Sequence, residues 1–374
     1  MPFTTRLGPR CSAQILSAPV IRQVLTPELE KSWTTDGWCV LEGAIPTADV
    51  HAADAALAHM FPTVSEMDGA AREGGSARAS SRAATATATS DRAATPDRTA
   101  TSDRTAIPDW AATPDGAAAG VPAGTSDQQE SDRTARWRNW DAQWPEFPFR
   151  SKSLNDIVMH DVLIGVAEKL LGTDDIRLYM ALITAKYANQ SSHFNQLLHA
   201  DYPNNMLVVP RDEGPYRQLE TFVYLTDVTP ESGATRMVSV RKTAHIPVEC
   251  HTLAYADYPE LYEEPGIATG PEGTIVCYRP DVYHRSVDWS EPGRRRIMLH
   301  ISFRTAECEW AGFHAWPIKG FSPEWHSFVA GADPRRLSLL GFPRPGHPYW
   351  TPETVAGVAA RYPKLDVTPW ESAL

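Results

Sequence analysis

The feature that most limits how this chain can fold is a stretch, Gly69 to Arg136, with only three large apolar residues: Ile107, Trp110 and Val121. From Ser90 onward it repeats a six-residue unit of the kind Ser-Asp-Arg-Ala-Ala-Thr. A hexapeptide period can signal a β-helix, but rungs of Ala and Thr bury too little apolar surface to offset an ordering cost of about 1–2 kcal/mol per residue. We therefore predict that residues 69–136 are a low-complexity, disordered insertion in an otherwise folded chain.

The charge and cysteine content exclude several classes of protein. The chain of 374 residues carries a net charge of −11, and the insertion is nearly neutral, with eight Arg against seven Asp and two Glu. The folded part is therefore acidic, which argues against nucleic-acid binding. No apolar run approaches the roughly 20 residues of a membrane span, and residues 1–22 lack the apolar block of a secretory signal. The five scattered cysteines predict free thiols in a cytoplasmic protein rather than a disulfide framework.

Helices are expected to come before strands in the folded part. In residues 1–68, Thr26-Pro27 marks a helix start, Trp38–Leu41 reads as a strand, and a second helix begins at Thr47. After the insertion, the apolar spacing predicts one helix over Ser153–Leu171, closed by Gly172.

From Ile176 onward, segments rich in β-branched and aromatic residues alternate with turn signals. They are Leu178–Tyr187, Leu219–Leu225, Thr235–Val240, Thr274–Tyr278 and Arg295–Phe303. Helices followed by strands predict an α+β fold with an antiparallel sandwich or barrel in residues 137–316. The Pro- and Trp-rich residues 317–374 are expected to wrap the core as loops, with one helix near Pro352–Arg361.

The triplet His199-Ala200-Asp201 is the first candidate for chemistry. On a strand, residues i and i+2 point to the same face, so the imidazole and the carboxylate converge as metal ligands must. Alone, such a triplet is weak evidence, because it is more often a surface or turn pair than a metal site.

The second candidate is His284, which follows an apolar strand and a turn and would lie at the mouth of a β-scaffold. Ten residues later, Arg294-Arg295-Arg296 opens another strand. Alternate residues of a strand share a face, and Arg295 alternates with the apolar residues of this strand, so it should point inward. Arg294, Arg296 and His300 should then face outward. The apolar residues are Ile297, Leu299, Ile301 and Phe303. A buried Arg needs an anion, and a carboxylate is its natural bidentate partner.

Two His and one carboxylate, with three open positions, form the facial triad of non-haem Fe(II) oxygenases. The order His-x-Asp, His, then Arg eleven residues later resembles the phytanoyl-CoA dioxygenase family of Fe(II)/2-oxoglutarate oxygenases. Further segments are similar to that family: Asp36–Pro46, the stretch from Lys186 and Gln196 into the triplet, Leu225–Thr235, Gly273–Val276 and His284-Arg285-Ser286.

The resemblance implies a double-stranded β-helix (jelly-roll) core flanked by helices. It implies that the catalytic residues His199, Asp201 and His284 hold Fe(II), and that Arg295 pairs with the distal carboxylate of 2-oxoglutarate, with Gln196 and Lys186 as further cofactor contacts. Dioxygen and a small-molecule substrate would be the partners, with hydroxylation and the release of succinate and CO2 as the outcome. A bulge in the strand would shift the carboxylate from Arg295 to a neighbouring Arg.

Two other functions remain open from the sequence. One is a jelly-roll metalloenzyme of another class, an isomerase or hydrolase using Zn or Mn, which would keep the metal ligands and have no use for Arg295. The other is a non-catalytic binding protein on the same scaffold, with residues 69–136 as its interaction segment.

Overall fold

The computed structural model describes residues 23–67, 145–188, 196–201, 207, 217–247, 250–288, 294–308, 311–312, 316–320 and 322–374. The chain divides into two units, Met1–Val64 with Trp140–Leu374, and Ser65–Asn139. All elements named below belong to the first unit. The predicted insertion, residues 69–136, lies outside the described residues.

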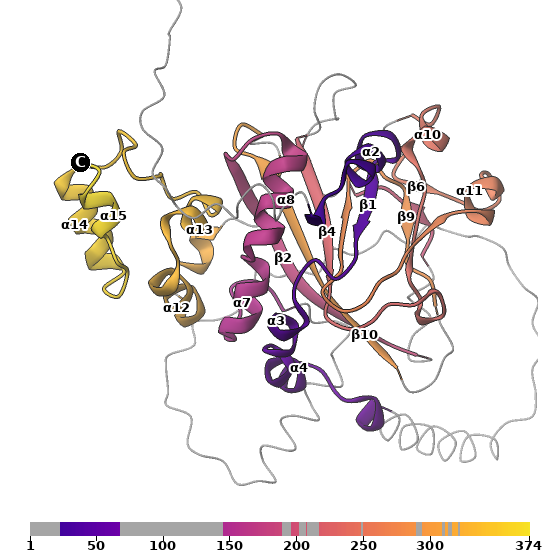
Figure 1. Cartoon of the computed structure of the whole chain (residues 1–374), viewed down its shortest axis with the longest axis horizontal. Helices are drawn as coiled ribbons and strands as arrows, with labels where there is room; N and C mark the ends of the chain where they lie inside the picture. Colours follow the sequence, from indigo (N-terminus) through magenta and orange to yellow (C-terminus); the bar gives the residue numbers. More distant parts are fainter. Residues whose placement is uncertain are drawn as a thin grey trace, which may run out of the picture. The chain divides into compact units, whose positions relative to one another are not determined.

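Two five-stranded antiparallel sheets form the centre of this α+β unit (Figure 1). The main sheet has the order β1 (Trp38–Leu41), β8 (Ile275–Tyr278), β4 (Gln218–Tyr224), β10 (Arg295–Thr305) and β2 (Ile176–Tyr187). The second sheet has the order β6 (Thr252–Leu253), β3 (Leu198–His199), β9 (His284–Arg285), β5 (Thr235–Met237) and β7 (Gly266–Ala268). From β2 to β5 and from β7 to β10, the chain alternates between the two sheets at each successive strand. The short elements η2 (Pro230–Ser232), α10 (Val240–Thr243) and α11 (Pro259–Glu263) lie between these strands along the chain.

The main sheet is covered on both faces, which explains why its central strands have no side that is exposed to solvent. Phe222 of β4 and Met298 of β10 belong to a buried cluster that also contains Met237 of the second sheet. On the opposite face, helix α8 (Asp161–Leu171) packs against β2, β4 and β10, as Figure 1 shows. All seven residues of β4 are buried as a result.

The helices before the sheets follow the predicted signals in part. Helix α2 (Pro27–Asp36) begins after Thr26, whose side chain accepts a hydrogen bond from the Leu29 amide at 3.4 Å, as predicted. The helix predicted over Ser153–Leu171 is instead two helices, α7 (Lys152–Val158) and α8, because His160 adopts an extended backbone and caps α8. The helix predicted from Thr47 is likewise split, into α3 (Thr47–His51) and α4 (Asp54–Met60).

The C-terminal segment contains more helix than the sequence indicated. The predicted helix is present as α14 (Pro352–Arg361), but α12 (Pro323–Gly331), α13 (Pro334–Leu339), α15 (Thr368–Glu371) and the 3₁₀ turn η3 (Trp316–Lys319) accompany it. Helices α12 and α13 each begin with a proline directly after a capping residue, Ser322 or Asp333. These prolines, which suggested loops, occupy the first helical position, where the missing N–H has no cost. Within the described ranges, no helix has the length and apolar character that a membrane crossing requires.

Candidate metal centre

Two histidines meet at the centre of the second sheet. His199 in β3 and His284 in β9 are directly opposite each other in the antiparallel pairing, and their ring centroids are 4.5 Å apart. Each ring places its Nδ1 at 3.0 Å from the carbonyl oxygen two residues earlier, on Leu197 and Val282. Because a carbonyl only accepts, Nδ1 carries the proton in both rings, and each Nε2 keeps a lone pair for a metal ion.

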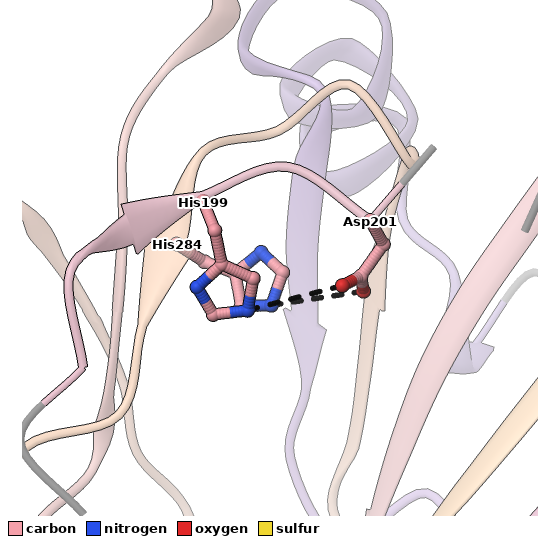
Figure 2. A group of neighbouring side chains, drawn as sticks. All are labelled: His199, Asp201 and His284. Atoms are coloured by element: carbon pink, nitrogen blue, oxygen red, sulfur yellow. Dashed lines mark ion pairs between the residues drawn. The ribbon is translucent and has the colours of Figure 1, made fainter. Parts of the chain in front are cut away.

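Asp201 supplies the third group, as Figure 2 shows. Its Oδ1 lies 3.9 Å from Nε2 of His199, and its Oδ2 lies 3.7 Å from Nε2 of His284. The three ligand atoms all lie within 4.8 Å of one another. The His-x-Asp triplet and the distal His are therefore brought together as the sequence predicted.

The backbone of the triplet is held from outside by His251. The amide of Ala200, between the two ligands, donates to the His251 carbonyl at 3.0 Å, and His251 Nδ1 donates back to the Ala200 carbonyl at 2.9 Å. The Asp201 amide donates to the Pro280 carbonyl at 3.0 Å. These hydrogen bonds hold the backbone of the triplet in the extended conformation that places the side chains of His199 and Asp201 on the same side of the chain.

The protonation states suit a metal ion. Burial lowers the pKa of His199, and a proton on the neighbouring His284 would lower it further, so the His199 ring is neutral near pH 7. Burial alone would raise the pKa of the Asp201 carboxyl, but His284, His199 and the Tyr278 hydroxyl outweigh it and lower that pKa. Metal ligands must be neutral imidazoles and ionised carboxylates, and His199 and Asp201 meet these conditions at neutral pH.

A hydroxyl group supports the carboxylate directly. Tyr278 in β8 donates a hydrogen bond from its hydroxyl to Oδ2 of Asp201 at 2.8 Å. Burial, and then the negative charge of Asp201, raise the pKa of Tyr278 well above its usual value, so the phenol keeps its proton. No sequence pattern indicated this role for Tyr278, because every residue of β8 is buried and no alternation of polar and apolar residues marks its inner face.

Two basic side chains lie opposite each other on the inner face of the main sheet. Arg296 in β10 and Lys186 in β2 are opposite each other in the antiparallel pairing. Burial, then the charge of Arg296, lower the pKa of Lys186 to about 6, and the charge of Lys186 in turn lowers the pKa of His199. The Lys186 amine donates to the hydroxyl of Ser286. Gln196 contacts the same residue, accepting from the Ser286 amide at 3.2 Å.

The predicted orientation of the arginines is wrong for Arg296. Arg296 is 1% exposed, and its guanidinium donates to the Gly233 carbonyl. Arg295 instead donates to the Pro62 carbonyl at 2.9 Å, and Arg294 is exposed as expected. The alternating apolar residues of β10, which begin at Ile297, face the helix layer. The residues between them, which begin at Arg296, therefore face the second sheet and the histidines.

His300 lies on the same face of β10 as Arg296, so the prediction that it faces outward is also wrong. Its Nε2 lies 3.0 Å from the Thr184 hydroxyl, and its ring centroid lies 4.8 Å from that of Phe222. Burial lowers the pKa of His300 to about 3, so it stays neutral despite the nearby charge of Asp201. Ser286, two residues after His284, could have been found with the same i, i+2 rule that identified Asp201.

The comparisons with known proteins give little beyond this geometry. No family model matches the sequence, and no curated protein matches it significantly. Among solved structures, the chain is similar to HygX from Streptomyces hygroscopicus with nickel and 2-oxoglutarate bound, at 13% identity and a TM-score of 0.41, over 78% of this chain and 96% of HygX. Apo HygX is similar at 12% identity and the same TM-score, over the same shares of the two chains. Likenesses this weak do not inform the site, whose interpretation depends on its own residues.

Proposed function

We propose that this chain is a non-haem Fe(II)- and 2-oxoglutarate-dependent dioxygenase, similar to the phytanoyl-CoA dioxygenase family, that hydroxylates a small molecule. The observation that carries the proposal is the convergence of His199, Asp201 and His284 at the centre of the second sheet, with the Nε2 atoms of both histidines and the carboxylate facing one another. Two imidazoles and one carboxylate are the ligand set of oxygenases that keep open positions on Fe(II).

The proposed fold of this unit is a double-stranded β-helix. The alternation of strands between two antiparallel sheets supports it, as does the position of His199 and His284 on neighbouring strands. In such a scaffold the inner face of the main sheet forms the floor of the site, which gives the inward residues of β2 and β10 a role in binding.

The second observation is the pair of basic side chains on that inner face. Burial and the charge of Arg296 disfavour the ammonium form of Lys186, and a carboxylate between the two residues would pair with Arg296 and favour that form. We therefore propose Arg296, in place of the Arg295 expected from the sequence, as the partner of the distal carboxylate of 2-oxoglutarate. Lys186 and Ser286 would contribute further hydrogen bonds, and Gln196 would hold Ser286 in position.

The chain's own residues would prepare the reaction rather than carry it out. Together with 2-oxoglutarate and dioxygen, Fe(II) in such a site supplies the oxidising power to remove hydrogen from an unactivated C–H bond. The neutral His199 and the ionised Asp201 would hold the metal without first losing protons, and His284 would offer its Nε2. Arg296 and Lys186 would orient the co-substrate, and the aromatic rings of Phe222 and Tyr278 would exclude water from the inner side of the site.

Succinate formation tests the proposal. The purified chain, supplied with Fe(II), 2-oxoglutarate and air, is expected to produce succinate slowly even without its substrate, and the rate should fall to background when oxygen is removed. Turnover of an ester or isomerisable substrate with Zn²⁺ and no oxygen, without succinate, would instead identify a metalloenzyme of another class.

Binding of 2-oxoglutarate is expected to take up as much as about one proton per site near pH 7.5. The pKa of Lys186 is lowered to about 6, so its amine is mostly neutral at that pH. A carboxylate placed beside it favours the ammonium form and raises the pKa, so a proton enters from the buffer. Isothermal titration calorimetry in two buffers of different ionisation enthalpy measures this uptake, and Lys186→Met should remove it. Equal binding heats for the wild-type protein in both buffers would argue against Lys186 as a contact.

A further inference from the structure

We infer that Tyr278 is the positioning residue that makes Asp201 a one-oxygen metal ligand; this inference assumes the proposed metal site. Its hydroxyl donates to Oδ2 of Asp201 at 2.8 Å. Among the residues that the structure describes, it is the only hydrogen-bond donor to this carboxylate. The Tyr278 side chain is 3% exposed, with its ring centroid 5.0 Å from that of Phe222 and 4.9 Å from that of His284. The ring is therefore clamped, and the hydroxyl has a fixed place.

The hydrogen bond makes the two carboxylate oxygens of Asp201 unequal. Oδ2 already accepts the Tyr278 proton, which withdraws electron density and restricts rotation of the carboxylate. Oδ1 accepts no such bond. It lies 3.9 Å from Nε2 of His199, whereas Oδ2 lies 3.7 Å from Nε2 of His284. We infer that a metal ion between the two histidines would be bound through Oδ1, the oxygen that Tyr278 does not engage.

The number of bound oxygens decides what else the metal can hold. With one oxygen from Asp201, two histidines and six positions, three positions stay open. A chelating co-substrate would need two of them, and dioxygen would need the third. If Asp201 bound through both oxygens, it would close one of these positions, so the Tyr278 hydroxyl protects the position that the reaction needs.

The chain provides a matched control at Tyr179. This residue is 2% exposed, and its hydroxyl also donates to a buried carboxylate, that of Glu220. Glu220 is not part of the triad. Tyr278→Phe and Tyr179→Phe therefore each remove one hydroxyl from a buried tyrosine–carboxylate pair, and only the first pair includes a metal ligand.

Titration with Co²⁺ tests the inference, because its visible absorption reports both affinity and coordination number. We expect Tyr278→Phe to weaken Co²⁺ binding by about 10- to 100-fold, the usual effect of losing a partner that orients a ligand. The visible bands should change in intensity, whereas Tyr179→Phe should bind as the wild type does. Thermal unfolding of the metal-free variants controls for a general loss of structure.

Affinity and spectrum of Tyr278→Phe that match those of Tyr179→Phe would overturn the inference. Its failure is distinguishable from failure of the proposed function. If the wild type binds Co²⁺ but shows no response to added 2-oxoglutarate, the proposed co-substrate is wrong, and the comparison of the two variants still decides the role of Tyr278. A wild type that binds no metal would contradict both.

Discussion

Replacing His284 by alanine is expected to abolish metal binding by this protein. His284 is a buried member of the triad, and its Nε2 faces both the carboxylate of Asp201 and the ring of His199. Its loss leaves two ligands, and the affinity should fall by more than the roughly 100-fold that loss of a supporting hydrogen bond costs. Titration with Co²⁺ or Fe(II) under anaerobic conditions measures the change.

A matched variant distinguishes the loss of a metal ligand from a general effect of removing a histidine. His347 is exposed near the C-terminus, where its Nδ1 accepts from the Tyr349 amide at 3.1 Å. His347→Ala should bind metal with the affinity of the wild type. Equal affinities for His284→Ala, His347→Ala and the wild type would show that the metal, if one binds, is held elsewhere.

The second large effect concerns the two neighbouring arginines. Arg296→Gln is expected to weaken 2-oxoglutarate binding by about 10- to 150-fold, because a hydrogen-bonded charged pair contributes about 1.5–3 kcal/mol and each 1.4 kcal/mol is tenfold. Arg295→Gln loses a bond to the Pro62 carbonyl outside the site and should change the affinity by less than about twofold. Calorimetric titration of the metal-loaded protein gives both values.

The folding of these variants must be checked, because Arg296 is buried and Gln leaves its site incompletely filled. Metal affinity provides that check, since the triad does not include Arg296 and should bind Co²⁺ normally in both variants. If Arg295→Gln weakened 2-oxoglutarate binding more than Arg296→Gln, the co-substrate would be bound by Arg295, as the sequence predicted.

The three candidate metal ligands could be predicted because much of their signal is local. His199 and Asp201 are two residues apart, so alternation places them on one face, and His284 follows a recognisable strand and turn. The facial-triad pattern and the family resemblance joined His284 to the triplet, and the pairing of His199 with His284 agrees with that prediction. The α+β composition could be predicted for a similar reason, since helical and strand periodicities occupy separate parts of the chain.

The orientation of Arg296 could not be predicted, because β10 is buried on both faces. Alternating apolar residues identify the inner face of a strand only where the other face is exposed to solvent. Here the apolar residues Ile297 and Leu299 face the helices, while the inner face carries Arg296 and His300 among apolar and aromatic residues. The break between α7 and α8 was missed for a different reason: apolar spacing continues across His160, and only its backbone conformation shows the new start.

The most direct measurement of the central claim is the visible absorption of the protein mixed with Fe(II) and 2-oxoglutarate without oxygen. The proposed chelate on a His199–Asp201–His284 centre predicts a broad metal-to-ligand charge-transfer band that is absent when either component is omitted and lost in His199→Ala. No band in the wild-type protein, or a band that persists unchanged in His199→Ala, would contradict the proposal.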